Sequence, residues 1–134
     1  MAKLAATAIA LLFALVAAAS AGAVAKRGFA FGRIGGNIVP FAVSIGNDGS
    51  VTATGPVKLG RKHLTRIQIA NLNRIAATNA FGSIPAVTNC PGSLPDVAAT
   101  YVRIGPRTVR VHGTCLLGYQ RIYTALERAV KLTY

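Results

Sequence analysis

The stretch that decides the fold is residues 97–131, VAATYVRIGPRTVRVHGTCLLGYQRIYTALERAVK. Apolar and polar residues first alternate with a period of two, which predicts a strand over Val97–Ile104. A turn at Gly105-Pro106 leads into a second expected strand, Thr108–Gly113. The residues expected to face a core are Ala98, Thr100, Val102 and Ile104 in the first strand and Val109 and Val111 in the second.

After the second strand the spacing of apolar residues becomes helical. Six of them recur every three or four positions, which predicts an amphipathic helix with its polar residues outside. The apolar set is Tyr119, Ile122, Tyr123, Leu126, Ala129 and Val130, and the polar set is Gln120, Arg121, Glu127, Arg128 and Lys131. The C-terminal part of the chain is therefore expected to be a hairpin followed by a helix.

The preceding part of the chain has the same order of elements. The chain is predicted to turn strand-like from Ile38 to Ile45, and because Pro40 lacks an N–H, this strand is expected either at a sheet edge or beginning near Pro40. A second strand is predicted over Val51–Thr54, with Asp48-Gly49 between the two as the strongest hairpin signal in the sequence. Thr65 and Gln68 have the spacing of a capping box, in which each side chain bonds the backbone N–H of the other residue. This spacing predicts a helix over Arg66–Thr78.

The remaining segments carry loop signals. Phe81, just past the predicted helix, is expected to fill the core at the helix end. Residues 83–96 contain three prolines and are predicted to form a loop. Residues 26–37, rich in glycine and basic residues, are expected to form a loose N-terminal arm that joins at most a sheet edge.

The order of predicted elements is ββαββα. It favours an α+β fold in which a four-stranded antiparallel sheet of two hairpins carries both helices on one face. We expect one domain over residues 38–134, because the chain that follows the predicted signal peptide, about 110 residues, is large enough for a single core.

The N-terminus is predicted to be a secretory signal peptide, residues 1–25. Lys3 precedes an uncharged apolar run that ends in small residues, where two A-x-A cleavage signatures overlap. We expect cleavage after Ala23 or Ala25 and an extracytoplasmic location for the mature protein. An uncleaved membrane anchor is the alternative, because the run is long enough to span a bilayer.

The charge of the chain is strongly positive. Only Lys3 of the fifteen Lys and Arg residues lies in the predicted signal, so fourteen basic residues face three acidic ones, a net charge of +11. Such a charge favours anionic partners such as wall polymers or anionic lipid. The alternative is the composition bias of a GC-rich genome, which favours arginine, alanine, glycine and valine. Nucleic acid is not an expected partner of an exported protein.

Two cysteines, Cys90 and Cys115, are expected to form a disulfide. Cys90 lies in the loop before the second hairpin and Cys115 just after that hairpin. Because the start of one antiparallel strand lies beside the end of its partner, the two sulfurs are expected within bonding reach. Two buried free thiols are the alternative.

No pattern in the sequence predicts an active site, a metal site or a cofactor. His112 lies three residues before Cys115, but the disulfide needs that cysteine. We expect His112 to be a solvated histidine beside Arg110 on the outer sheet face. The candidate binding surface is this face, with Tyr101, Arg103, Arg110 and His112. A two-residue turn would place Tyr101 opposite Arg110, either as a stacking platform or as an ordinary exposed strand pair.

Short motifs along the chain resemble those of a family of small exported bacterial domains of unknown function. They are Arg33 to Gly36, Asp48 to Val51, Cys90-Pro91, Pro95-Asp96 and Val109 to Cys115. The resemblance covers about residues 33–132 and implies a hairpin-helix-hairpin-helix plan, with one cysteine in the middle loop and one after the last strand.

A fainter resemblance is to emfourin-type inhibitors of metalloproteases. It rests on Arg33 to Gly36, Phe81 and Pro95-Asp96. The chain departs from that family in its signal peptide, its cysteine pair and its basic charge. The sequence as a whole predicts a secreted non-catalytic module that binds an unidentified partner. The alternatives are a proteinaceous inhibitor of a secreted metalloprotease and a binder of anionic cell-wall or membrane surfaces.

Overall fold

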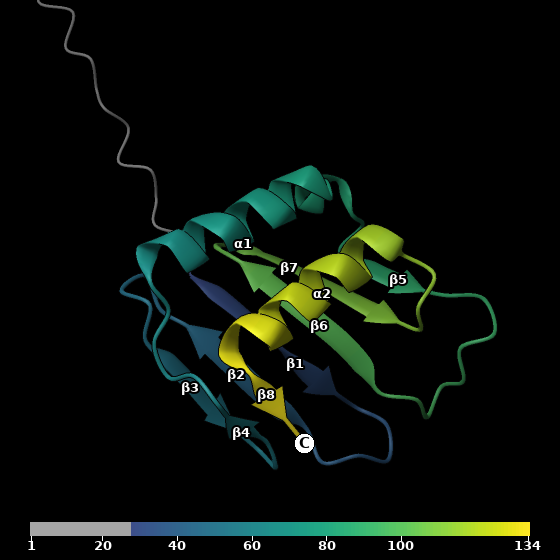
Figure 1. The fold of residues 1–134 in the computed structure, drawn as a ribbon. Helices are drawn as coiled ribbons and strands as arrows, with labels where there is room; N and C mark the ends of the chain where they lie inside the picture. The colour runs from purple at the N-terminus through teal and green to yellow at the C-terminus, as the bar shows by residue number, and fades with distance from the viewer. Residues whose placement is uncertain (1–27) are drawn as a thin grey trace, which may run out of the picture.

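The computed structural model describes residues 28–134, so the predicted signal peptide and its cleavage sites lie outside the described residues. Figure 1 shows a sheet covered by two helices. The elements are β1 (Phe29–Ile34), β2 (Phe41–Ile45), β3 (Val51–Thr54), β4 (Lys58–Leu59), α1 (Arg66–Thr78), a 3-10 turn (Phe81–Ser83), β5 (Val87–Asn89), β6 (Ala99–Ile104), β7 (Arg107–His112), α2 (Leu117–Val130) and β8 (Leu132–Thr133).

The sheet has six strands in the order β3-β2-β1-β6-β7-β5 and is mixed, because β5 runs parallel to β7. The α+β class is confirmed, whereas the four-stranded antiparallel sheet predicted from two hairpins is wrong. Both hairpins exist, but a central strand joins them and a short strand extends the far edge. A separate two-stranded ladder pairs β4 with β8 and ties residues 58–59 to the C-terminal end.

The central strand is β1, in a segment predicted to be a loose arm. β1 pairs with β2 on one side and with β6 on the other. Phe29 and Phe31 point into the core, whereas the outward-facing Ala30 and Gly32 are buried among neighbouring residues. Glycine weakens a strand when it is considered alone, but two ladders and two buried phenylalanines outweigh that weakness. The folded unit therefore includes residues upstream of the predicted boundary at Ile38.

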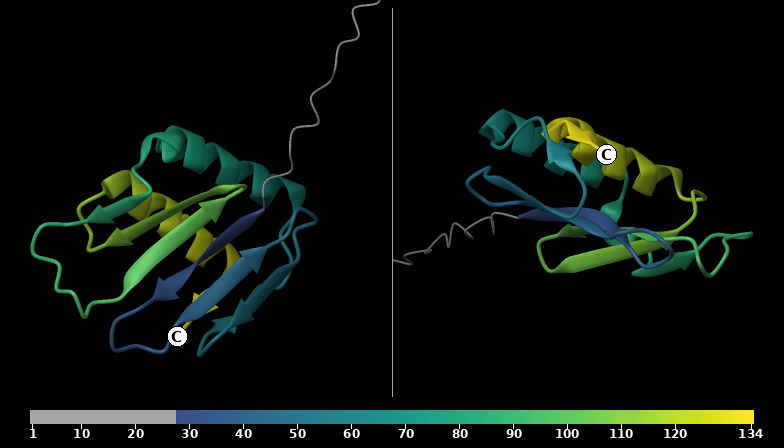
Figure 2. Two further views of the ribbon diagram at one scale, coloured as in Figure 1. Left: turned by 180° about the vertical axis from the view of Figure 1, so that it is seen from behind. Right: turned by 90° about the horizontal axis from the view of Figure 1, so that it is seen from below.

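Both helices lie on the same face of the sheet, as predicted, and no described helix covers the other face (Figure 2). α1 has the predicted bounds, and Thr65 and Gln68 form the predicted capping box. α2 buries five of its predicted apolar residues: Tyr119, Ile122, Tyr123, Leu126 and Val130. None of the described helices is both long enough and apolar enough to span a membrane.

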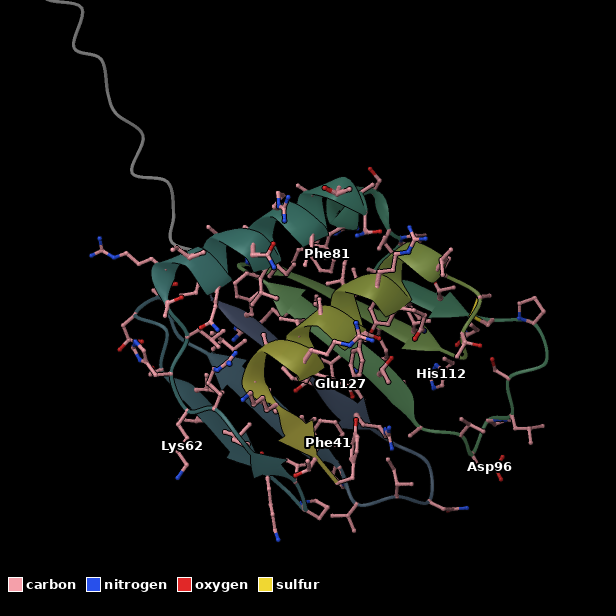
Figure 3. All side chains as sticks on the ribbon, viewed as in Figure 1. Phe41, Lys62, Phe81, Asp96, His112 and Glu127 are labelled. Atoms are coloured by element: carbon pink, nitrogen blue, oxygen red, sulfur yellow. A yellow bond between two sulfur atoms is a disulfide. The ribbon has the colours of Figure 1, made fainter. Side chains whose placement is uncertain are left out.

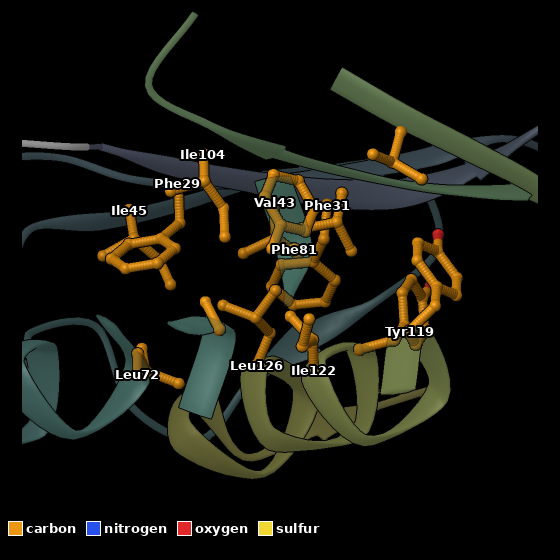
Figure 4. Close-up of a cluster of buried hydrophobic side chains, with 14 of the residues drawn as sticks. Phe29, Phe31, Val43, Ile45, Leu72, Phe81, Ile104, Tyr119, Ile122 and Leu126 are labelled. Carbon is orange, nitrogen blue, oxygen red and sulfur yellow. The ribbon is translucent and has the colours of Figure 1, made fainter. Parts of the chain in front are cut away.

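The core fills the space between the helices and the sheet (Figure 4). Phe81 is buried there, which confirms the prediction that it fills the core beside the end of α1. The hydroxyl groups of two core tyrosines also join α2 to the sheet. Tyr119 donates to Thr100 Oγ1 at 3.0 Å, and Tyr123 donates to the carbonyl oxygen of Gly32 at 3.2 Å.

Two boundaries in the second half of the chain differ from the prediction. The strand expected from Val97 begins at Ala99, because Leu94 and Val97 close a turn through a backbone hydrogen bond. The predicted loop over residues 83–96 contains β5, which pairs with β7 through Val87 to Asn89. Three residues are too few for a pattern with a period of two to identify a strand.

Candidate binding surfaces

The outer sheet face brings together the residues predicted from the second hairpin. Gly105-Pro106 forms a two-residue turn, so Tyr101 lies opposite Arg110, as predicted, and Arg103 lies opposite Thr108. Both arginines are exposed and Tyr101 is half-buried. This surface therefore offers two guanidinium groups beside one aromatic ring on a face that no described helix covers.

Tyr101 is held against the central strand. Its register partner on β1 is Gly32, and a Cβ atom at Gly32 would lie 3.0 Å from the Tyr101 ring and 2.2 Å from the Phe41 carbonyl oxygen. The absence of a side chain at Gly32 lets the ring lie close to the sheet. Burial raises the pKa of the Tyr101 hydroxyl, so this group is a neutral hydrogen-bonding group at physiological pH.

His112 differs from its predicted environment. The side chain is half-buried, and its Nδ1 atom is buried without a hydrogen-bond partner among the described residues. Its register partner Asn89, on β5, lies on the same side of the sheet. The predicted solvated histidine is therefore only partly solvated, because β5 extends the sheet past the edge expected from the sequence.

The disulfide pair is confirmed. The sulfurs of Cys90 and Cys115 lie at bonding distance and their Cα atoms are 5.5 Å apart. The bond closes the base of an exposed loop, in which the Leu94 side chain is 62% exposed. Ser93 Oγ donates to the carbonyl oxygens of Cys90 and His112 and adds a second tie at the same place.

A cleft of about 590 Å³ lies between α2 and the ends of β1, β6 and β7. It is lined by Arg33, by several hydroxyl and amide side chains, and by two of the three carboxylates of the chain, Asp96 and Glu127. Figure 3 shows both carboxylates on the side of α2 that faces away from α1.

Arg33 at this cleft is fixed by aromatic rings. Its guanidinium carbon lies 5.2 Å from the centroid of the Tyr134 ring and 5.8 Å from that of Phe41. The Tyr134 hydroxyl donates to Glu127 Oε1. Burial and the neighbouring Glu127 carboxylate raise the pKa of Tyr134 to about 12. No local sequence pattern identifies this cluster, because its members come from four separate segments.

A basic groove follows the seam between α1 and α2 on the outside of the helical layer. It consists of two hollows, of about 510 and 340 Å³, that share Ile75, Ala125 and Arg128. Arg121 lines the first hollow and Arg61 the second, and no Asp or Glu of the described chain lines either. We call this feature the helix groove.

No pattern in the sequence predicts the helix groove. The predicted position of Arg121 and Arg128 on the outside of the last helix is confirmed, and their spacing of seven residues puts them on one side of it. The sequence does not show that α1 lies beside α2 and forms the opposite side of the groove. It also does not show that Arg61, from the segment after β4, lies at the same groove. A pattern along one helix does not show which second helix lies beside it.

The described residues contain no group of three or more His, Cys, Asp or Glu side chains that could hold a metal ion. No protein-family model, curated protein or solved structure matches this chain. The resemblances to small exported bacterial domains and to emfourin-type inhibitors therefore rest on the short sequence motifs alone.

Proposed function

We propose that this protein is a non-catalytic binding module of the extracytoplasmic space and that its ligands are anionic. Three of the basic residues, Lys3, Lys26 and Arg27, lie outside the described part, which leaves twelve basic residues against three acidic ones. This imbalance creates a positive field around the folded domain, which attracts polyanions and speeds their association.

The observation that carries the proposal is the position of the three carboxylates. Asp48 accepts hydrogen bonds from the backbone N–H and the hydroxyl of Ser50, which lower the pKa of this carboxyl group. Glu127 accepts from Tyr134, and both Glu127 and Asp96 line the cleft beyond α2. No carboxylate lines the helix groove, so its arginines keep their charge available for a ligand.

The proposal is tested by retention of the protein on immobilised linear polyphosphate, with an uncharged polysaccharide matrix as the control. We expect retention on polyphosphate alone, with release as salt rises through the physiological range, where the Debye length is about 8 Å. Failure to bind at low salt, or binding that salt does not weaken, would contradict the proposal.

A further inference from the structure

We infer that the helix groove is the site at which this protein binds a linear polyanion, with the anionic chain extended along the seam between α1 and α2. The inference rests on the proposed function and names its site. The two hollows share residues and so form one trough rather than two isolated pockets.

One bank of the groove presents guanidinium groups in a row. Arg121 and Arg128 are exposed and lie seven residues apart on α2, a rise of about 10 Å along the helix axis. Arg61 lies at the end of the row, where its Nη1 donates to the Ala129 carbonyl oxygen at 2.8 Å. That bond fixes Arg61 and uses one of the five N–H donors of a guanidinium. Each guanidinium can donate two parallel hydrogen bonds to a phosphate or carboxylate group.

The other bank and the floor suit the body of a polymer chain. α1 contributes the amide side chains of Gln68 and Asn71 to the lining, and Ile75 lines both hollows. Asn79, just past α1, also lines the groove, where one N–H of its amide donates to the Ile75 carbonyl oxygen at 2.8 Å. Arg74 Nη2 donates to Asn71 Oδ1 at 2.6 Å, which fixes the Asn71 amide with its NH₂ group available to donate. Amide donors on one side of the groove and arginines on the other can contact a bound polyanion from both sides.

The electrostatic contrast across α2 directs the ligand to this side of the helix. Asp96 and Glu127 line the cleft on one side, and arginines line the groove on the other. The two carboxylates of the cleft outnumber its one arginine, Arg33, so a polyanion is attracted to the groove rather than to the cleft. A trough favours a linear polymer over a membrane surface, because a flat bilayer would rest on the ridges that border the seam.

The test compares two double variants that remove the same charge from opposite faces. Arg121→Gln with Arg128→Gln changes the helix groove, and Arg103→Gln with Arg110→Gln changes the outer sheet face. All four arginines are exposed, so both variants are expected to keep the melting temperature of the parent. If the groove variant does not fold, Arg121→Gln and Arg128→Gln are measured singly.

The probe is soluble linear polyphosphate, titrated against the full-length protein at several salt concentrations. We expect the groove variant to lose at least tenfold in affinity and the slope of log affinity against log salt to become shallower by about one to two. The sheet-face variant is expected to stay within about threefold of the parent. Vesicles of anionic phospholipid form a second arm, in which we expect weaker binding and a smaller difference between the two variants.

The outcomes separate the two proposals. If the parent protein does not bind polyphosphate at low salt, the proposed function fails. If the parent binds but both variants weaken equally, the proposed function stands and the groove is not the site. Binding to vesicles that is tighter than binding to polyphosphate, and that the groove variant abolishes, would overturn the assignment to a linear polymer.

Discussion

Gly113 links the last strand of the large sheet to the disulfide. Its φ of +90° lies in the left-handed region, where side chains other than glycine are strained. A Cβ atom at this position would lie 2.7 Å from Cys90 Cβ and 2.7 Å from Ser93 Oγ. Conformation and space therefore both require glycine between β7 and Cys115.

Gly113→Ala is expected to lower the free energy of unfolding by about 1–3 kcal/mol, because it puts a side chain at a positive φ and a Cβ atom 2.7 Å from Cys90 Cβ. The matched control is Gly82→Ala, where a Cβ atom meets nothing within 4 Å and φ is not positive. Gly82→Ala is expected either to leave the free energy of unfolding unchanged or to raise it by no more than about 1 kcal/mol. Chemical denaturation of both variants measures the difference, and equal effects would contradict this account.

At the scale of the element, α2 is attached to the sheet through buried tyrosines. Burial raises the pKa of Tyr119 to about 12, an effect that its hydrogen bond to Thr100 partly offsets, and burial also raises the pKa of Tyr123. A tyrosine whose pKa is raised by folding stabilises the protein fully below its unfolded pKa, about 10. That contribution is lost as the pH rises through the folded value.

The free energy of unfolding is therefore expected to fall between about pH 10 and pH 12. Tyr119→Phe removes one of the responsible groups, so the fall should be shallower in this variant. At neutral pH the same variant should lose about 1 kcal/mol, because its hydrogen bond to Thr100 is absent. Urea denaturation at several pH values measures both effects, and parallel stability curves for parent and variant would contradict the role of Tyr119.

At the scale of the whole molecule, β1 holds the two hairpins in one sheet. Without it the strand order would separate into β3-β2 on one side and β6-β7-β5 on the other. The core would also lose Phe29 and Phe31, both almost completely buried. Truncating one buried phenylalanine costs about 3–5 kcal/mol, and a whole domain is stable by only about 5–15 kcal/mol.

A chain that begins at Ile38 is therefore expected not to fold, although it contains every strand and helix predicted from the sequence. The control begins at Gly28 and retains β1, so it should unfold cooperatively on heating. Near-ultraviolet circular dichroism during thermal unfolding distinguishes the two. A cooperative transition in the chain that begins at Ile38 would show that β1 is dispensable.

Local interactions made several parts of this protein predictable from its sequence. The bounds of α1 follow from a capping box that spans four residues, Thr65 to Gln68. The pairing of Tyr101 with Arg110 follows from a two-residue turn, and two cysteines allow only one intramolecular disulfide. In the capping box and the two-residue turn, the residues that form the sequence pattern also make the contact. The two cysteines are distant in the sequence, and the closed hairpin between them brings them together.

The tertiary structure alone decided the centre of the sheet and the candidate site. β1 is stabilised by partners on both sides and by core contacts that are distant in the sequence, so its own glycine-rich composition could not identify it. The helix groove exists because α1 and the segment around Arg61 pack beside the exposed arginines of α2. Periodicity shows which face of a helix or strand is buried, but the neighbour that covers it depends on the packing of the whole chain.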